Sequence, residues 1–182
     1  MWGRFVIAFL VLAPSAGVAL ENTVVPFAPR LEVAVAPHPS AVAVADLDRN
    51  GRADLVTVHP ESDAIWIALS RPTGDFEVHG PLSAGIAPRA VEIADVNGDA
   101  RLDLIVANAI SNSVSVLLGR GDGTFEPARD TPVGHAPSGV AVADFNGDDR
   151  PDLAVANLFD DTLGVFLGSG TGTFAPGATV VS

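Results

Sequence analysis

Short runs of alternating apolar and polar positions dominate the chain. One run covers Val140 to Ala143, and a second, from Leu153 to Asn157, follows after nine residues. A third run covers Val114 to Leu118. A period of two is typical of half-buried β-strands, and no window carries the i, i+3, i+4, i+7 apolar stripe of a helix. The pattern predicts an all-β protein built from short strands.

The strand pattern repeats every 49 residues without an insertion. Prolines, valines, leucines, glycines and phenylalanines coincide when the chain is shifted by this period. The clearest coincidences are Phe27, Phe76, Phe125 and Phe174; Leu69, Leu118 and Leu167; and Gly74, Gly123 and Gly172. Agreement at so many positions indicates tandem duplication.

Each repeat has room for four strands separated by turn signals. In the second repeat the third strand leads into the glycine-rich turn Gly119–Thr124, and we expect the fourth strand to begin at Phe125. Four such strands make an antiparallel sheet of about the size of a propeller blade, roughly 40–50 residues. We therefore expect a partial β-propeller of three four-stranded antiparallel blades plus an N-terminal extra strand. The expected units are 20–36 (the strand of an incomplete blade), 37–85, 86–134 and 135–182.

Three blades do not close into a ring, because the wedge angle between neighbouring sheets would be too wide for side chains to fill. Three arrangements stay open: a fragment of a longer propeller, an open stack, or a protomer that completes a ring with copies of itself.

The N-terminal residues 1–19 have the pattern of a secretory signal peptide. Arg4 supplies the charged start, Phe5 to Ala13 the apolar segment, and Gly17 to Ala19 a small-residue cleavage site. The apolar segment is too short to span a bilayer, although an uncleaved anchor is the alternative. We expect a secreted protein, placed outside the cell, in a periplasm or at a cell surface, with no membrane insertion after cleavage.

Composition narrows the possible chemistry. The chain has no cysteine and a net charge of −12. An acidic surface repels nucleic acid, so we expect no nucleic-acid partner. The absence of cysteine excludes disulfides, thiolate metal sites and cysteine nucleophiles. No set of nucleophile, base and orienting residue is visible, so we expect no enzymatic activity.

Three nine-residue acidic segments recur at the 49-residue period: loop 1 (46–54), loop 2 (95–103) and loop 3 (144–152). Each has Asp or Asn at positions 1, 3, 5 and 9, and the backbone carbonyl of the arginine at position 7 can add a further oxygen. Hard oxygen ligands in a flexible loop suit Ca²⁺ better than Mg²⁺, and histidine-free loops argue against zinc or copper. The candidate ligands are Asp46, Asp48, Asn50, Arg52 and Asp54; Asp95, Asn97, Asp99, Arg101 and Asp103; and Asp144, Asn146, Asp148, Arg150 and Asp152.

These loops are not EF-hands, since position 12 holds Thr57, Val106 or Val155 instead of glutamate. Position 6 calls for a left-handed backbone, which Gly51 adopts freely and Ala100 adopts with a steric penalty. We expect loops 1 and 3 to bind metal better than loop 2. The alternative is that Asp, Asn and Gly only form good turns here.

The residues 141–157 followed by Gly172-Thr173-Phe174 resemble the FG-GAP/VCBS repeats of integrin-α-like β-propellers, and residues 113–125 resemble the second half of the same unit. The resemblance covers about 37–182 and implies calcium-binding loops in extracellular domains that serve adhesion or ligand binding. Two departures stand out. Only Gly51 supplies the glycine that the family favours at position 6, and a full propeller of the family has about seven blades.

Taken together, these observations predict a secreted calcium-binding FG-GAP/VCBS repeat protein that acts as a non-enzymatic interaction or adhesion module for an unknown protein or glycan ligand. The calcium would be structural. The alternatives are a lectin-like glycan-binding propeller and an accessory fragment of a secreted hydrolase or lyase.

Three further features have simpler interpretations. His59 aligns with asparagines and is expected to end a strand and cap a turn. Trp66 is expected to act as a wedge between blades, with an exposed stacking platform as the alternative. Arg120-Gly121-Asp122 spells an integrin-recognition tripeptide, but its place in the repeat predicts an ordinary hairpin turn.

Overall fold

The computed structural model describes residues 5–6 and 32–181, and every regular element in these residues is a β-strand. The described part of the chain therefore offers no helix long and apolar enough to cross a membrane. Twelve of the strands form three four-stranded antiparallel sheets, as expected from the repeat. They are, in sheet 1, β3 (Ala41–Ala45), β4 (Asp54–His59), β5 (Ala64–Ser70) and β6 (Phe76–Ser83); in sheet 2, β7 (Pro88–Ala94), β8 (Asp103–Asn108), β9 (Ser113–Leu117) and β10 (Arg129–Pro132); and in sheet 3, β11 (Pro137–Ala143), β12 (Asp152–Asn157), β13 (Thr162–Gly168) and β14 (Phe174–Val181).

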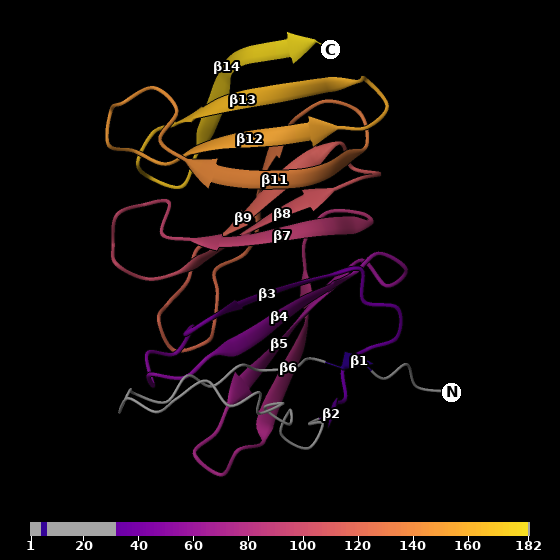
Figure 1. Cartoon of the computed structure of the whole chain (residues 1–182), viewed down its shortest axis with the longest axis vertical. Coiled ribbons are helices and arrows are strands. Elements are labelled where there is room, and N and C mark those ends of the chain that lie inside the picture. The colour runs from indigo at the N-terminus through magenta and orange to yellow at the C-terminus, as the bar shows by residue number, and fades with distance from the viewer. Residues whose placement is uncertain (1–4, 7–31, 182) are drawn as a thin grey trace, which may run out of the picture.

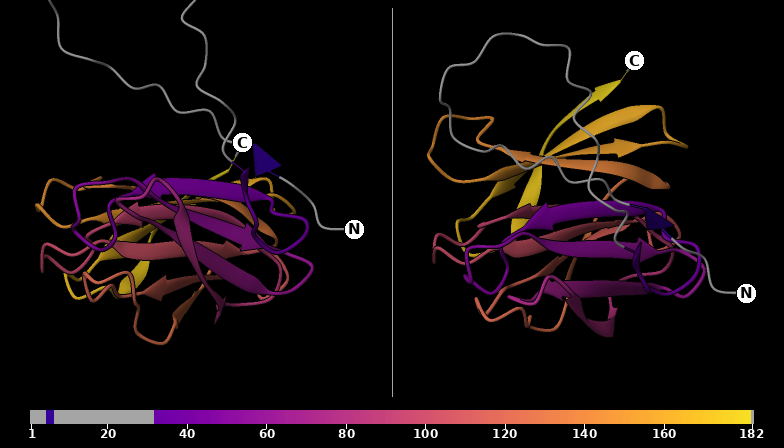
Figure 2. Two further views of the ribbon diagram at one scale, coloured as in Figure 1. Left: turned by 90° about the horizontal axis from the view of Figure 1, so that it is seen from below. Right: turned by 60° about the horizontal axis from the view of Figure 1, so that its bottom comes forward.

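The strands of each sheet follow one another in chain order, so each sheet is a meander. The first strands of successive sheets are neighbours, since β3 contacts β7 and β7 contacts β11. Figure 1 shows the three sheets stacked from sheet 1 (indigo to magenta) to sheet 3 (orange to yellow), and Figure 2 shows the same succession from two other directions. This is the arrangement of consecutive propeller blades, and the partial β-propeller is confirmed.

A short N-terminal strand lies outside the three sheets. It is β2 (Glu32–Val33), which pairs with β1 (Phe5–Val6) in a two-stranded antiparallel ladder. The remainder of the expected signal peptide and Phe27, the marker of the expected incomplete blade, lie outside the described residues.

The fourth strand of sheet 2 begins later than expected. Phe125 forms only an isolated bridge with Gly119, and β10 starts four residues further on at Arg129. Pro127 lies between the bridge and β10, and a proline has no N–H to donate to a ladder. In sheets 1 and 3 the equivalent strands begin at Phe76 and Phe174, as expected.

Two apolar cores hold the sheets together. Between sheets 1 and 2, Ile65 and Ile67 of β5 pack with Leu104 of β8. Between sheets 2 and 3, Ile105 of β8 packs with Leu153 of β12. Alternation along β8 therefore sends successive side chains into different cores, and all six of its residues are buried. Each fully buried aliphatic side chain contributes about 1.5–3 kcal/mol, which makes sheet 2 the most strongly held of the three.

Candidate metal-binding loops

The three acidic loops each connect the first and second strands of a sheet. Loop 1 joins β3 to β4, loop 2 joins β7 to β8, and loop 3 joins β11 to β12. Each first strand ends with an alanine, and the aspartate at position 9 opens the second strand. The same connection in each repeat places all three loops on one side of the stack (Figure 1).

The aspartate at position 1 organises the backbone of its loop. Asp95 accepts the N–H of Gly98 and the N–H of Ala100, each at 2.7 Å. Asp144 accepts the N–H groups of Gly147 and Asp149 at the same positions, 4 and 6, whereas Asp46 accepts those of Asn50 and Gly51 at positions 5 and 6. The chain therefore curls around position 1 and brings positions 3 and 5 back toward it.

The aspartate at position 9 ties the loop to the end of the third strand. Asp103 is fully buried, and its two oxygens accept the N–H of Val96 at 2.9 Å and the N–H of Gly119 at 2.8 Å. Asp54 and Asp152 are equally buried and make the same pair of bonds. Sequence reasoning assigned these carboxylates to metal alone, and the structure adds this latch role.

Positions 4 and 6 of each loop have a left-handed backbone. In every loop one of these two positions is occupied by a residue other than glycine. The φ angles at positions 4 and 6 are 62° and 79° for Arg49 and Gly51, 75° and 60° for Gly98 and Ala100, and 79° and 62° for Gly147 and Asp149. A left-handed residue with a Cβ costs roughly 1–2 kcal/mol. The left-handed backbone expected at Ala100 is confirmed, but Arg49 of loop 1 has the same conformation, so the backbone gives loop 1 no advantage over loop 2.

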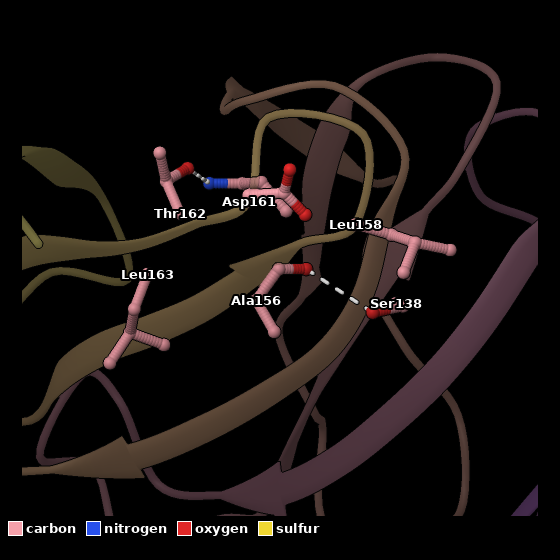
Figure 3. Close-up of a pocket in the computed structure, with 7 residues that line it drawn as sticks. Ser138, Ala156, Leu158, Asp161, Thr162 and Leu163 are labelled. Carbon is pink, nitrogen blue, oxygen red and sulfur yellow. Dashed lines mark hydrogen bonds between the residues drawn. The ribbon is translucent and has the colours of Figure 1, made fainter. Parts of the chain in front are cut away.

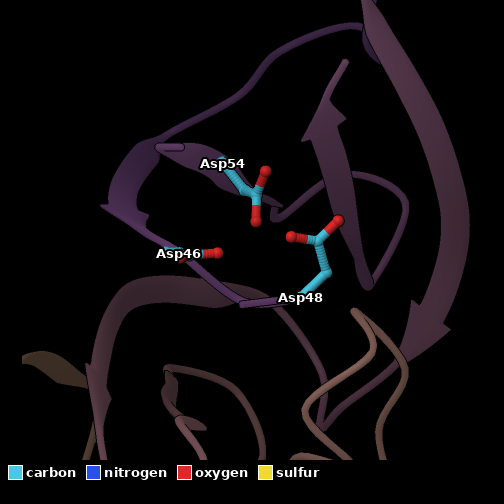
Figure 4. Close-up of side chains that lie close together, drawn as sticks. All are labelled: Asp46, Asp48 and Asp54. Carbon is cyan, nitrogen blue, oxygen red and sulfur yellow. The ribbon is translucent and has the colours of Figure 1, made fainter. Parts of the chain in front are cut away.

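Loop 1 brings three carboxylates together. Asp46, Asp48 and Asp54 each offer an oxygen within 4.8 Å of the others, and among the described residues they are the one such group of ionisable ligands. Figure 4 shows the three carboxylates pointing toward a common space between the loop and the start of β4. Asn50 adds an amide oxygen to the same loop. This oxygen accepts the N–H of Arg52 at 2.8 Å.

Loops 2 and 3 exchange the residue types at positions 3 and 5, and this changes their electrostatics. Asp99 and Asp148 stand at position 5, and each forms an ion pair with the position-7 arginine, Arg101 or Arg150. Each arginine also donates its Nε–H to a glycine carbonyl near the end of the third strand, at 2.9 Å from Arg101 to Gly119 and 3.0 Å from Arg150 to Gly168. In loops 2 and 3 the arginine guanidinium therefore lies beside the aspartate as a positive charge. This role was not predicted from the sequence, where only the arginine carbonyls were considered as ligands.

The carboxylates of loops 2 and 3 differ in the direction in which their pKa is shifted. Burial raises the pKa of Asp103, and the nearby charges of Asp99 and Asp95 raise it further, against the two N–H bonds that lower it. Burial tends to raise the pKa of Asp99 as well. The N–H of Arg101, the Asn97 amide and the Arg101 charge together outweigh it, so the pKa of Asp99 is lowered. The pKa of Asp144 is lowered, chiefly by the N–H of Asp149.

Family models match most of the chain. A model described as an FG-GAP-like repeat matches residues 46–106 and 95–155, and a model of the FG-GAP repeat matches residues 136–178. The chain belongs to the FG-GAP repeat family. All three acidic loops lie within the matched residues, and with the three sheets described above the chain is a module of β-propeller-like FG-GAP repeats.

Comparison with curated proteins found no match. Among solved structures, the chain is similar to part of the Tc holotoxin pore of Photorhabdus luminescens, in a form that carries a mutation in TccC3, with 26% sequence identity and a TM-score of 0.47. The similar region covers 80% of this chain, and the chain spans 7% of that much longer chain.

Two residues of the first FG-GAP repeat, His59 and Trp66, have side chains with different surroundings in the fold. His59 is fully buried, and its ring nitrogens lie 2.9 Å from the Pro37 carbonyl and 2.9 Å from the Thr57 hydroxyl. The interpretation of His59 as a strand-end cap is confirmed. The wedge interpretation placed Trp66 between two blades. In the structure Trp66 does not lie between two of the described sheets, so that interpretation is wrong for the described residues. Trp66 points away from sheet 2, because Ile65 and Ile67 on either side of it face the core.

The Arg120-Gly121-Asp122 segment of the FG-GAP module is a hairpin turn, as expected. Arg120 donates its N–H to the Thr124 carbonyl at 2.9 Å, and Asp122 accepts both the N–H and the hydroxyl of Thr124. These bonds from Thr124 lower the pKa of Asp122.

The end of the FG-GAP stack opposite the acidic loops carries exposed apolar side chains. Ile110 and Phe159 occupy the same position in successive turns and are 67% and 78% exposed. With Leu158 and Arg89 they line a cavity of about 210 Å³ between sheets 2 and 3. These residues were not predicted as a surface site from the sequence, although bulky apolar residues inside predicted turns were a signal for them.

Proposed function

We propose that this protein is a calcium-stabilised FG-GAP repeat module that is exported from the cytoplasm and binds another macromolecule without catalysing a reaction. The observation that carries the calcium part is the convergence of Asp46, Asp48 and Asp54 within 4.8 Å in loop 1. Two carboxylates at this separation repel by about 1 kcal/mol in water and by about 3 kcal/mol at an effective dielectric of 20. A divalent cation among them would turn this repulsion into attraction.

The donor set fits calcium. Every candidate ligand atom of the loops is a carboxylate, amide or carbonyl oxygen, and these are the ligands of Ca²⁺ and Mg²⁺. A nine-residue loop with flexible polar side chains does not impose the strict octahedron that Mg²⁺ requires. In loop 1, Asp46, Asp48, Asn50 and Asp54 would hold the ion, with the carbonyl of Arg52 as a further donor.

Loop 1 is the loop that gains most from a metal. Its position-5 residue is Asn50, and Arg52 forms no ion pair with any described residue, unlike Arg101 and Arg150 in the other loops. The side chain of Arg49 also leaves its own loop and donates to the Ala100 carbonyl at 2.6 Å. We therefore infer that loop 1 binds calcium first, and that an ion in loops 2 and 3 must displace an arginine from an aspartate.

Calcium in these loops would be structural. It would join the two strands of each first hairpin and would bind the folded chain only, which adds stability by mass action. At a calcium concentration of about 100 times the dissociation constant, one site adds about 2.7 kcal/mol. For a domain of this size that corresponds to a rise in melting temperature of about 5–11 °C.

Calorimetry on EDTA-stripped protein tests this part. We expect heat on adding calcium, a rise in melting temperature, and a weaker response to magnesium. Asp48→Asn should remove the tightest site, whereas Asp122→Asn in the glycine-rich turn is the matched control and should leave calcium binding unchanged. No heat and an unmoved melting temperature in the unaltered protein would refute the calcium proposal.

Export is supported by the charged, apolar and small-residue segments of residues 1–19. Expression of the whole chain with a C-terminal tag, followed by cell fractionation and N-terminal sequencing, tests it. We expect the exported form to begin at Leu20. A cytoplasmic product that still begins at Met1 would contradict export.

A binding role without catalysis is supported by two observations. Both ring nitrogens of His59, the most buried histidine, already have partners in the fold. The apolar turn residues Ile110, Leu158 and Phe159 offer a surface of the kind that marks protein contacts. Phe159→Ser should weaken binding to a partner while leaving the melting temperature within about 1 °C, because the side chain is mostly exposed.

A further inference from the structure

The turns between the second and third strands of sheets 2 and 3 carry apolar side chains that the repeat does not require. Ile110 and Phe159 are 67% and 78% exposed, and the same position of sheet 1 is Glu61. The three turns have the same length, at residues 60–63, 109–112 and 158–161, so a polar residue is compatible with this turn. The isoleucine and the phenylalanine contribute little to the core and are available to a partner.

Backbone hydrogen bonds fix both turns. Ala109 donates its N–H at 2.9 Å to the carbonyl of Ala87, just before the first strand of sheet 2. Leu158 donates its N–H at 3.1 Å to the carbonyl of Ala136, just before the first strand of sheet 3. The exposed apolar side chains therefore stand on a surface that is formed before a partner arrives, which lowers the entropy cost of binding.

The cavity between the two turns has the size of a side chain. Its volume is about 210 Å³, with Ile110 on one side and Pro137, Leu158 and Phe159 on the other. Sites for small molecules usually have about 300–1,000 Å³, so this cavity suits a single apolar side chain of a protein partner better than a free cofactor.

Of the described residues that line the cavity, Arg89 is the charged one. Its side chain is exposed and forms no ion pair with a carboxylate of the described residues. The equivalent residues of sheets 1 and 3 are Ser40 and Ser138, so the repeat does not require a cation here. In a chain with a net charge of −12, an arginine of this kind beside an apolar cavity favours a carboxylate from outside the chain.

The acid that follows Phe159 in its turn is engaged elsewhere. The oxygens of Asp160 lie 2.6 Å from the backbone nitrogen of His135 and 2.6 Å from its Nδ1. The bonds from the His135 N–H and ring lower the pKa of Asp160. This carboxylate therefore stays on His135 and leaves Arg89 to another acid.

A second hollow continues the surface along sheet 3. It has a volume of about 370 Å³ and shares Ser138 and Leu158 with the first cavity. Figure 3 shows this hollow, with Ser138 and Leu158 on one side and Thr162 and Leu163 on the other. A bound segment longer than one residue can therefore follow the surface past the first cavity.

We propose that the cavity binds an extended segment of a partner protein in which an apolar residue stands next to an aspartate or a glutamate. The apolar side chain enters between Ile110 and Phe159, and the carboxylate pairs with the guanidinium of Arg89. The inference rests on the binding role proposed above and adds the chemistry of the partner. Arginine and large aromatic side chains are the residues that dominate the affinity of protein interfaces.

The two contacts have different effects on binding. The apolar side chain supplies most of the affinity, because it loses its contact with water. The guanidinium is exposed, so its ion pair is screened by salt and contributes selectivity more than affinity. We therefore expect binding to weaken as the salt concentration rises, without being abolished.

Selection of short linear peptides from a phage-displayed random library, on the unaltered immobilised chain in calcium, tests the proposal. We expect the enriched peptides to carry Asp or Glu next to Leu, Ile or Phe. The selected peptides are then synthesised with a fluorescent label, and fluorescence polarisation gives their dissociation constants for the unaltered chain and its variants.

Charge reversal makes the test specific. Arg89→Gln should weaken binding by about 5-fold and Arg89→Glu by about 10-fold or more. Replacing the acid of the peptide with lysine should weaken binding to the unaltered chain and strengthen binding to Arg89→Glu. Arg120→Glu changes the net charge equally on an exposed arginine at the acidic-loop end and is the matched control, which should bind as the unaltered chain does. Circular dichroism checks that each variant is folded.

Enriched peptides without an acid would overturn the proposal, as would peptides that bind Arg89→Glu as tightly as the unaltered chain. If such peptides still lose affinity for Phe159→Ser, the surface keeps its binding role and only the acidic partner is refuted. Failure to enrich any peptide would contradict the protein-binding surface itself.

Discussion

Replacing Asp103 with alanine tests whether the aspartate at loop position 9 is a structural latch or only a metal ligand. Its carboxylate is fully buried and accepts the N–H of Val96 at 2.9 Å and the N–H of Gly119 at 2.8 Å. Alanine would leave both buried donors without an acceptor. Each unpaired group costs about 1–3 kcal/mol, so the free energy of unfolding should fall by about 2–6 kcal/mol. Small domains are stable by about 5–15 kcal/mol, so this loss is large.

Urea unfolding in EDTA is the appropriate assay, because it excludes any loss that comes from calcium. With a denaturant slope of about 2 kcal/mol per molar, the midpoint should fall by about 1 M or more. Asp103→Asn keeps the shape and one acceptor oxygen, so its loss should be about half as large. Glu92→Ala removes an exposed acid from the same sheet and should change stability by no more than about 0.5 kcal/mol.

Unfolding of Asp103→Ala at the same urea concentration as Glu92→Ala in EDTA would show that Asp103 is not a structural latch. A difference that emerges only when calcium is added would assign the residue to metal binding alone. Because asparagine keeps the shape of the side chain, equal losses for the alanine and asparagine variants would show that the cavity left by alanine contributes little and that the charge or the second acceptor oxygen of Asp103 carries the effect.

Three other predictions concern the loops. Ala100→Gly should raise stability by about 1 kcal/mol in a thermal melt, since it removes a Cβ from a left-handed residue; no change would contradict the strain argument. The pKa of Asp103 is raised in the folded protein, so its contribution to stability should fall as pH rises from the unfolded pKa to the folded one. The pKa of Asp144 is lowered, so its contribution to stability should be lost as pH falls through the folded pKa. Asparagine at either position should remove the corresponding slope in urea titrations across pH in EDTA. Arg150→Gln should strengthen calcium binding to loop 3 in calorimetry, because calcium no longer competes with the arginine for Asp148; weaker binding would refute the competition.

The fold was accessible from the sequence because its signals are local. The 49-residue period, the alternation within each strand and the turn residues predicted three four-stranded sheets, and the structure confirms them. The late start of β10 at Arg129 was the exception, since the equivalent phenylalanines begin strands in the other two sheets.

The candidate site was only partly accessible. Spacing predicted that Asp46, Asp48 and Asp54 converge, and the structure brings them within 4.8 Å. Spacing did not separate the latch role of Asp103 from that of a ligand, because its acceptor role involves Gly119, which is sixteen residues away. Nor did it reveal the pairing of Arg101 with Asp99, because a sequence does not show which way a side chain turns.

The sequence by itself determined the number of repeats, the class of fold and the positions of the three acidic loops, since these follow from interactions between near neighbours in the chain. Only the tertiary structure decided which face of each sheet is covered. Leu69, Leu118 and Leu167 are identical in the repeat, yet two of them pack on a glycine of the next sheet and the third is exposed. The physical reason is that burial depends on which sheet stands opposite, and that is a property of the folded stack.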